Sequence, residues 1–237
     1  MAKSTSPKKR DVTREKILYT ALKLFQEMGF EKTTMRAIAD ECGLTPGATY
    51  YHFSYKEELV LEFYRKTSIE AIEHNQLIVL ESEDFKYRFK AMINFKFEQL
   101  LPYRELVHVL AGGVGDMQNP MSPFSAHSSE IRNDAIQMIE DVIKGSTIKV
   151  STVLRPHLSK ILWLYMMGII FFWSNDQSEG QHRTTKLLDL SLELVLRLLQ
   201  ASYLPLLGGI STKAVQILKL IESCTQTDML EEEQSNG

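Results

Sequence analysis

Residues 33–59 read TTMRAIADECGLTPGATYYHFSYKEEL, a stretch whose pattern predicts two short helices separated by a tight turn. Either Thr33 or Thr34 can cap the first helix, because a threonine oxygen accepts a hydrogen bond from an unpaired N–H of the first turn. Apolar residues then recur at helical spacing until Gly43, a residue type that commonly ends helices. The first helix should therefore be short and amphipathic.

The second helix of the pair has its own start signal. Thr45 can cap it, and Pro46 suits its first position, where a missing N–H costs nothing. We expect this helix to run from Pro46 to about Phe53. Two short helices joined by a turn that contains glycine form a helix-turn-helix, whose second helix enters the major groove of DNA. Spacing alone leaves a second interpretation open, a plain helical hairpin with Tyr50, Tyr51 and Phe53 in its core.

A further helix is expected on each side of this pair. The preceding one is predicted to have Thr13 as its cap and to end at Gly29, because apolar residues recur at helical spacing between them. The following one is predicted to begin with Ser54 and Glu57 in a capping box and to run toward Leu80. This long helix would link the helix-turn-helix to the rest of the chain.

The quoted stretch, together with FQEMGF at residues 25–30, closely resembles the DNA-binding segment of the tetracycline-repressor (TetR) family of bacterial transcription repressors. The resemblance covers roughly residues 12–60. It implies an all-α protein, with an N-terminal three-helix helix-turn-helix domain and a C-terminal helical domain for ligand binding and dimerisation. Thr49 departs from the family, which more often has Leu or Ile there, so its role stays open.

The residues expected at the DNA are Thr34, Arg36, Thr45, Pro46, Gly47, Tyr50, Tyr51, His52 and Lys56. Those that match family positions at the DNA backbone are Thr45, Tyr50, Tyr51 and His52. Pro46 and Gly47 match positions of base contact, where the missing side chain of glycine permits a close approach. Arg36 matches a position that sometimes reads guanine, although it could equally pair with Asp40 one helical turn away. Lys56 should project near a phosphate.

The distribution of charge agrees with a nucleic-acid partner at the N-terminal end. Residues 1–66 carry 12 Lys and Arg against 9 Asp and Glu, whereas the whole chain has a net charge of −3. A positive segment favours a polyanion because neutralised phosphates release counterions. Basic N-terminal arms also occur as solubilising segments, so charge alone does not decide the function.

Several classes of protein are disfavoured by the sequence. No apolar segment follows the basic N-terminus, and the longest apolar run, residues 161–173, has 13 residues where a membrane span takes about 20. We therefore expect a cytoplasmic protein without a membrane span. Cys42 and Cys224 form no CxxC pair and are expected to be reduced. The sequence contains no HExxH, GxSxG, P-loop or GxGxxG motif, so we expect neither an enzyme, nor a cofactor, nor a metal site.

Beyond Glu81 the chain lacks strand-like alternation and predicts helices only. The expected segments are a basic flexible arm at 1–10, the DNA-binding domain at 11–58, a helical domain at 59–226 and an acidic disordered tail at 227–237. The helices expected after residue 80 are 84–101, 102–111, 123–144, 156–173, 183–204 and 211–224. Residues 112–122, which contain three glycines, should form a loop, either a plain surface loop or a gate.

Two of these helical segments, 161–173 and 187–199, are apolar on almost every side. A helix without a polar face must be covered all round, so two of them in one domain predict a partner subunit. The family resemblance likewise implies a homodimer built from C-terminal helices, which would bind a palindromic operator. The residues expected in the interface are Trp163, Met167, Phe172, Leu190 and Leu194.

The middle of the chain is rich in Met and Phe, side chains that fill cores but also line pockets for apolar molecules. We expect a mostly apolar small-molecule effector between the helices that follow residue 80, whose binding would tilt the preceding long helix. The residues expected at this ligand are Met92, Tyr103, His108, Met138 and Tyr165. A helical interaction protein or corepressor without ligand response is the alternative, and activation instead of repression stays open.

Overall fold

The computed structural model describes residues 9–113, 115–203, 209 and 211–221, and the regular structure within these ranges is entirely helical. The predicted all-α class is confirmed. The α-helices, in chain order, are α1 (Lys9–Met28), α2 (Met35–Cys42), α3 (Pro46–His52), α4 (Lys56–Glu81), α5 (Phe85–Leu100), α6 (Arg104–Ala111), α7 (Ser129–Ile143), α8 (Leu158–Asn175) and α9 (His182–Ala201). Short 3-10 turns occupy Leu101–Tyr103, Arg155–His157 and Glu179–Gln181, and residues 211–221 are also helical.

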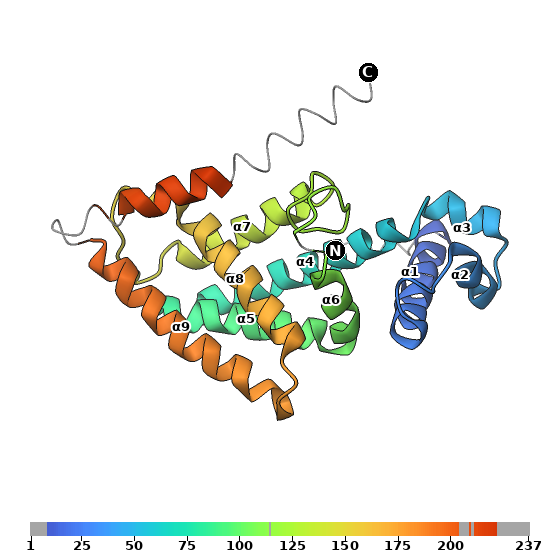
Figure 1. Cartoon of the computed structure of the whole chain (residues 1–237), viewed down its shortest axis with the longest axis horizontal. Coiled ribbons are helices and arrows are strands. Elements are labelled where there is room, and N and C mark those ends of the chain that lie inside the picture. The colour runs from blue at the N-terminus through green and yellow to red at the C-terminus, as the bar shows by residue number, and fades with distance from the viewer. Residues whose placement is uncertain (1–8, 114, 204–208, 210, 222–237) are drawn as a thin grey trace, which may run out of the picture.

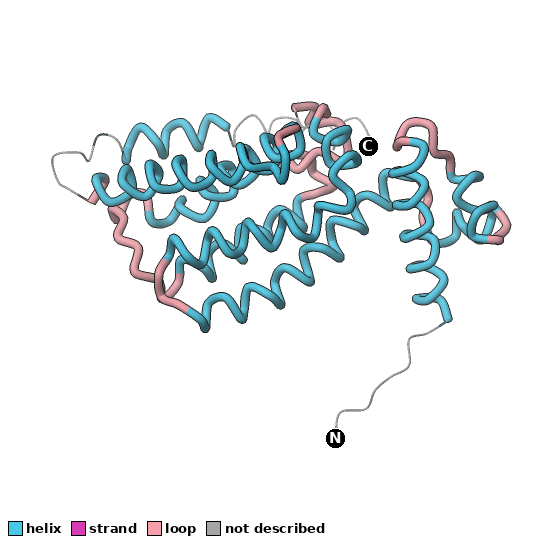
Figure 2. Tube along the Cα trace, turned by 90° about the horizontal axis from the view of Figure 1, so that it is seen from below, coloured by secondary structure: helices cyan, strands magenta, loops and turns pink. Residues whose placement is uncertain are grey.

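The molecule is elongated, with a small head at one end. Figure 1 shows α1, α2 and α3 gathered in this head and α5 to α9 grouped at the other end. α4 begins beside α3 and runs into the larger group, where it packs against α5 and α7. The view from below shows the same division (Figure 2). The long connecting helix predicted from the sequence is therefore confirmed.

The start and stop signals of the two short helices act as predicted. The Oγ1 atom of Thr34 accepts a hydrogen bond from the N–H three residues on, at 3.1 Å, and Gly43 ends α2 with a φ of 64°. The Oγ1 atom of Thr45 accepts the equivalent bond at 3.3 Å, and Pro46 lies in the first turn of α3. Glycine adopts the left-handed conformation after α2 without steric cost, which lets the chain turn into α3.

Two of the helix starts predicted for the N-terminal part of the chain are wrong. α1 begins at Lys9, so Thr13 lies inside the helix, and the first eight residues of the expected arm lie outside the described residues. α4 begins at Lys56, and Ser54 does not cap it. Instead, the carboxylate of Glu58 accepts a hydrogen bond from the N–H of Ser54 at 2.6 Å. Only the return half of a capping box forms, one residue later than the sequence predicted.

The head shares a hydrophobic core with the larger group of helices. Buried residues of α1, α2 and the start of α4 pack in one cluster with side chains from α5, α6 and the end of α8. The members of this cluster beyond residue 60 are Phe63, Leu100, Leu106, Val107, Leu110 and Trp173. The domain boundary predicted after residue 58 therefore does not coincide with a gap in packing.

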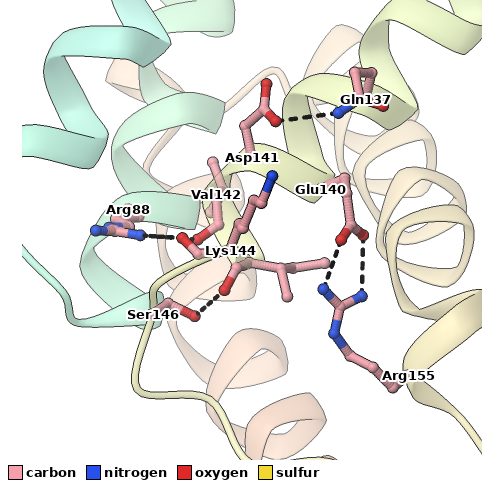
Figure 3. Close-up of polar contacts among 9 residues, drawn as sticks. Arg88, Gln137, Glu140, Asp141, Val142, Lys144, Ser146 and Arg155 are labelled. Carbon is pink, nitrogen blue, oxygen red and sulfur yellow. Dashed lines mark hydrogen bonds and ion pairs between the residues drawn. The ribbon is translucent and has the colours of Figure 1, made fainter.

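A buried arginine ties three helices together at the far end of the molecule. Arg88 of α5 donates to the carbonyls of Val79 at 2.7 Å and Lys144 at 2.9 Å, and also to those of Ser82 and Val142. These carbonyls belong to the C-terminal ends of α4 and α7, where helices leave acceptors unpaired and carry partial negative charge. Figure 3 shows Arg88 beside the end of α7. The guanidinium thus donates to carbonyls at the C-terminal ends of both helices.

An ion pair on the other side of α7 is more exposed. Arg155, in the turn that precedes α8, donates hydrogen bonds from both Nη atoms to the carboxylate of Glu140, at 2.5 and 3.0 Å (Figure 3). Nearby, Gln137 donates to Asp141 at 3.1 Å within the helix. These contacts fix the orientation of α7 against the start of α8.

The loop between α6 and α7 is longer than predicted. α7 begins at Ser129 and not at residue 123, because three buried serines hold the preceding residues in successive turns. The Oγ atom of Ser128 donates to the carbonyl of Ser122 at 2.7 Å, and Ser125 Oγ donates to that of Pro120 at 3.0 Å. Side-chain hydrogen bonds of this kind compete with helix formation.

The apolar segment around α8 lies inside the bundle. Residues 155–175 are long and apolar enough to cross a membrane by length and composition. In this fold α8 packs against α6, α7 and α9, and buries among others Leu162, Trp163 and Met166. A core helix of a helical protein meets the same criteria as a membrane span.

Candidate DNA-binding and ligand-binding sites

α3, the recognition helix, presents its predicted DNA-contacting residues to solvent. Tyr50 is 51% exposed and Tyr51 is 70% exposed, which is unusual for tyrosines in a short packed helix. A Cβ atom added at Gly47 would meet no atom within 4 Å. Packing within the described residues therefore does not require glycine at this position, and its missing side chain would permit a close approach by a docked surface. Thr45 and Pro46 are exposed beside it.

Two arginines of α1 flank the end of α3, and the sequence analysis did not identify them. Arg14 donates to the carbonyl of His52 at 2.7 Å, and Arg10 lies 5.6 Å from the ring centroid of Tyr51. Burial, together with the charges of these two arginines, lowers the pKa of His52. The imidazole is therefore neutral near pH 7 and offers one N–H donor. The signal for them was an Arg pair at i, i+4 in α1.

The remaining residues of α2 and α3 divide clearly. Thr34 is exposed and caps α2, so it borders the recognition helix. Arg36 is exposed, and among the described ion pairs none joins it to Asp40. Thr49 is fully buried, which answers the open question about its role: it belongs to the core.

Lys56 is engaged within the protein. Its ammonium donates to the carbonyl of Phe30 at 2.9 Å and to that of Glu31 at 3.5 Å, and lies 4.2 Å from the ring centroid of Phe30. These contacts hold the loop between α1 and α2 against the start of α4. These contacts give Lys56 a positioning role in the head, and the phosphate contact expected from the sequence stays a prediction.

A cavity of about 380 Å³ lies between α4, α5, α6, α7 and α8. Its size is within the range of small-molecule sites, about 300–1,000 Å³. The wall is mostly apolar, and its large apolar residues include Leu100, Val107, Leu110, Met121, Phe124, Met138, Trp163, Met167 and Ile170. Met121 and Phe124 come from the loop between α6 and α7, so this loop closes one side of the cavity. The loop is therefore part of the cavity wall, and its action as a gate stays a prediction.

The polar residues of the cavity wall were not predicted. They are Tyr64, Thr67, Ser68, Lys96, Ser128 and Arg132. Lys96 donates to the carbonyl of Thr67 at 3.2 Å, and burial lowers the pKa of its ammonium to about 8. Burial also lowers the pKa of Arg132 and raises that of Tyr64. The sequence contained one weak signal, a lysine placed between Phe95 and Phe97.

Of the five predicted ligand residues, only Met138 lines this cavity. Met92 packs in the core of the bundle, and Tyr103 packs on Phe63 with ring centroids 4.7 Å apart. His108 is on the exposed face of α6. The hydroxyl of Tyr165 is bonded to Ser191 at 2.7 Å. None of these four side chains lines the cavity, so their assignment to a ligand stays a prediction.

Three of the five predicted interface residues are exposed and two are not. Leu190 is 62% exposed, Leu194 58% and Phe172 38%, so all three are available to a partner subunit. Trp163 is buried and Met167 lines the cavity, so both face the interior. Their place in an interface stays a prediction, and packing within the chain already accounts for their apolar character. No cluster of potential metal ligands occurs in the described part of the chain.

A helix-turn-helix with an exposed recognition helix, joined by one long helix to a bundle that encloses a cavity, defines a DNA-binding transcription regulator. Residues 17–63 match the family of bacterial regulatory proteins, tetR family, and residues 88–211 match the tetracyclin repressor-like C-terminal domain. The chain belongs to the TetR family. It is a regulator of transcription and not an enzyme.

Known regulators resemble parts of the chain. The chain is 33% identical over 100 residues to the uncharacterized HTH-type transcriptional regulator YerO of Bacillus subtilis. This match covers 41% of the chain and 34% of YerO. The chain is 32% identical over 87 residues to the HTH-type transcriptional repressor KstR2 of Rhodococcus jostii, covering 37% and 43%. The matched region thus spans less than half the length of these two relatives.

Solved structures share the fold over most of the chain. A TetR-family transcriptional regulator from Syntrophomonas wolfei superposes with a TM-score of 0.62 at 17% identity, covering 79% of this chain and 96% of that one. FadR of Thermus thermophilus, solved in complex with lauroyl-CoA, gives 0.53 at 15% identity, covering 74% and 92%. At these identities the likeness shows the fold.

Proposed function

We propose that this protein is a cytoplasmic repressor that binds a palindromic operator as a homodimer and leaves it when a mostly apolar small molecule enters the cavity. The observation that carries this proposal is that α6 belongs to both sites. Val107 and Leu110 line the cavity, and both side chains also belong to the core shared with the head. A ligand that displaces α6 therefore acts on the packing of α1.

Two hydrogen-bonded contacts place α6 in this position. Arg104 at its start donates to the carbonyl of Trp173 at 3.2 Å and to that of Asp176, so the helix is held at the end of α8. Gln26 at the end of α1 donates to the carbonyl of Pro102, just before α6. Movement of α6 would therefore be transmitted to the end of α1, while its connection to α8 supplies a fixed point.

The free energy needed to release DNA limits which ligands can act in this way. A ligand releases DNA only to the extent that it binds the released conformation more tightly. Reducing operator occupancy from 99% to 1% needs about 5.5 kcal/mol of such preference. Apolar burial contributes to this preference only through surface that is buried in the released conformation and not in the operator-bound one, at about 25 cal/mol per Å².

The relatives support the two halves of the proposal separately. KstR2 of Rhodococcus jostii is named a repressor. FadR of Thermus thermophilus, which shares the fold, was solved with lauroyl-CoA, a molecule with a twelve-carbon acyl chain by its name. Exposed leucines on α9 support the dimer, since Leu190, Leu194 and Leu198 follow one another at four-residue spacing and are all more than half exposed.

The first experiment selects bound sequences from a pool of random duplex DNA. We expect a palindromic site whose half-sites are at least about one helical turn apart, since two symmetric heads must each reach a major groove. Arg36→Gln and Tyr50→Phe should weaken binding to it by about 1–3 kcal/mol. Specific binding that survives removal of residues 1–60 would contradict the assignment of the head.

The second experiment tests the coupling through α6. Compounds are screened for thermal stabilisation of the protein and then for release of the selected operator. Leu110→Ala should reduce release by a compound that still binds, whereas Val109→Ala, on the exposed face of the same helix, should not. If compounds bind in the cavity and none changes operator affinity, the alternative of an interaction protein without ligand response is favoured.

A further inference from the structure

The cavity wall carries positive charge without negative charge. Lys96 and Arg132 are both part of it, and no Asp or Glu is. Two cations do not strengthen the binding of a neutral apolar molecule, and a charge taken out of water costs several kcal/mol unless it is paired. Their presence among apolar walls is therefore a feature that the apolar ligand proposed above does not explain.

The surroundings of Lys96 leave its ammonium short of partners. Among the described contacts it makes one hydrogen bond, to the carbonyl of Thr67 at 3.2 Å, although an ammonium can donate three. Glu70 attracts it from the neighbouring turn of α4 but forms no ion pair with it within the described residues. The hydroxyl-bearing residues Tyr64 and Ser68 line the same cavity, and both lie on α4 within one turn of Thr67, whose carbonyl accepts from Lys96. Lysine and hydroxyl donors together match a carboxylate.

Arg132 is placed differently. Its Nη1 atom donates to the carbonyls of Pro123 at 2.8 Å and Ser125 at 3.0 Å, so it holds the loop that closes the cavity. Its charge adds to the positive potential of the wall, and its Nη1 atom is directed to the loop and not to the ligand space. Lys96 is therefore the cation that a ligand can bind without competing for the hydrogen bonds that hold the loop.

We infer that the cavity takes a carboxylic acid with an apolar body, and that the ammonium of Lys96, with the hydroxyl groups beside it, binds the carboxylate. The inference rests on the ligand-binding function proposed above and specifies the chemistry of that ligand. One ammonium with neutral donors suits a single negative charge, and the mostly apolar wall accommodates the remainder of the molecule. Straight-chain and aromatic acids share this chemistry.

The test compares acids with neutral molecules of the same shape. Binding of decanoic acid and 1-decanol, and of 2-naphthoic acid and 2-naphthalenemethanol, is measured by calorimetry with the full-length protein. The acid of at least one pair is expected to bind at least about tenfold more tightly than its alcohol, a difference of about 1.4 kcal/mol. The two pairs distinguish a straight chain from a fused ring.

Variants assign the preference to Lys96. Lys96→Met should abolish the difference between acid and alcohol, and Lys96→Arg, which keeps the charge, should retain part of it. Arg132→Gln should reduce acid binding less than Lys96→Met does. Lys86→Met, on the exposed face of the same helix, is the matched control and should leave the preference unchanged.

Equal binding of acid and alcohol, failure of both acids to bind below about 1 mM, or an acid preference that persists in Lys96→Met would overturn the inference. Operator binding is measured in parallel, so that the two proposals fail separately. An acid that binds through Lys96 without releasing DNA supports the inference and contradicts ligand release. Release by an unrelated neutral compound, with no acid binding, does the reverse.

Discussion

The guanidinium of Arg14 joins the recognition helix to α4: Nη2 lies 3.0 Å from the carboxylate of Glu62, and Nη1 donates to the carbonyl of His52. The same group lies 4.1 Å from the ring centroid of Phe53. Glu62 is also paired with Arg65, at 2.6 Å. His52, the last residue of the recognition helix, is thus connected to α1 and to the long helix α4.

Glu62→Gln should weaken operator binding about threefold to tenfold, on the order of 1 kcal/mol, because Arg14 loses the partner that orients it. Electrostatics alone predict the opposite sign, since removal of a negative charge near DNA should tighten binding. The measurement is fluorescence anisotropy with the selected operator. Glu27→Gln, an exposed residue of α1 far along the helix, is the control. Tighter binding by Glu62→Gln would show that Arg14 needs no such support.

Lys56→Met should destabilise the protein by about 1–2 kcal/mol, because the carbonyls of Phe30 and Glu31 lose their donor. The slope of log K against log salt concentration should stay unchanged, since no phosphate contact is lost. Urea unfolding and operator titrations at several salt concentrations measure the two effects. A slope reduced by about one, with unchanged stability, would restore the phosphate contact expected from the sequence.

Lys96→Met should stabilise the ligand-free protein by about 1–3 kcal/mol near pH 7, because burial lowers the pKa of Lys96 to about 8 from 10.5. Between these values the unfolded chain holds a proton that the folded protein has lost, so the wild type gains stability as the pH rises. The groups around the ammonium are Glu70, Tyr64 and Arg132. The advantage of Lys96→Met should shrink from pH 8 to pH 10, which urea unfolding at each pH measures. Parallel stability profiles would contradict this account.

Leu194→Glu should convert the proposed dimer into monomer or aggregate, because a charge is placed in the leucine row of α9. Sedimentation at micromolar concentration measures the mass. Leu80→Glu is the matched control, since Leu80 is 83% exposed on α4, outside this row, and its substitution should leave the mass unchanged. A monomeric wild-type protein would contradict the dimer itself.

Arg88→Met should cost about 3 kcal/mol or more of stability, because several buried carbonyls lose a charged donor at once. Arg155→Met, which breaks the more exposed pair with Glu140, should cost about 1 kcal/mol or less. Thermal unfolding of both variants provides the comparison. Similar losses for the two would show that Arg88 contributes no more than a surface ion pair.

The parts of this protein that the sequence predicted are those whose physical cause is local. Thr34, Gly43, Thr45 and Pro46 each act on a helix end within four residues, so their roles could be derived from spacing alone. The exposed position of Tyr50 followed from the family resemblance and agrees with the structure. The capping box at Ser54 failed because two adjacent glutamates could complete it, and packing selected the second.

The cavity could not be predicted because its wall combines single faces of five helices. α8 is apolar all round, so its sequence does not indicate that Trp163 and Met167 face the cavity while Phe172 faces outward. Arg132 is positioned by hydrogen bonds to the loop before α7. The sequence of that loop resembled a helix, although its turns are held by serine side chains. Tyr165 appeared suited to a ligand, but its hydroxyl finds a partner on α9.

The core shared by α1, α2, α4 and α6 bears on how regulators of this design can be recombined. A chimera joined after residue 58 would separate the head from Leu106, Val107 and Trp173, which complete its interior. A transplanted head would face foreign side chains there, and its response to ligand would be altered together with its stability. New pairings of operator and effector are therefore more accessible through substitutions on the solvent face of α3 and the wall of the cavity than through exchange of whole domains.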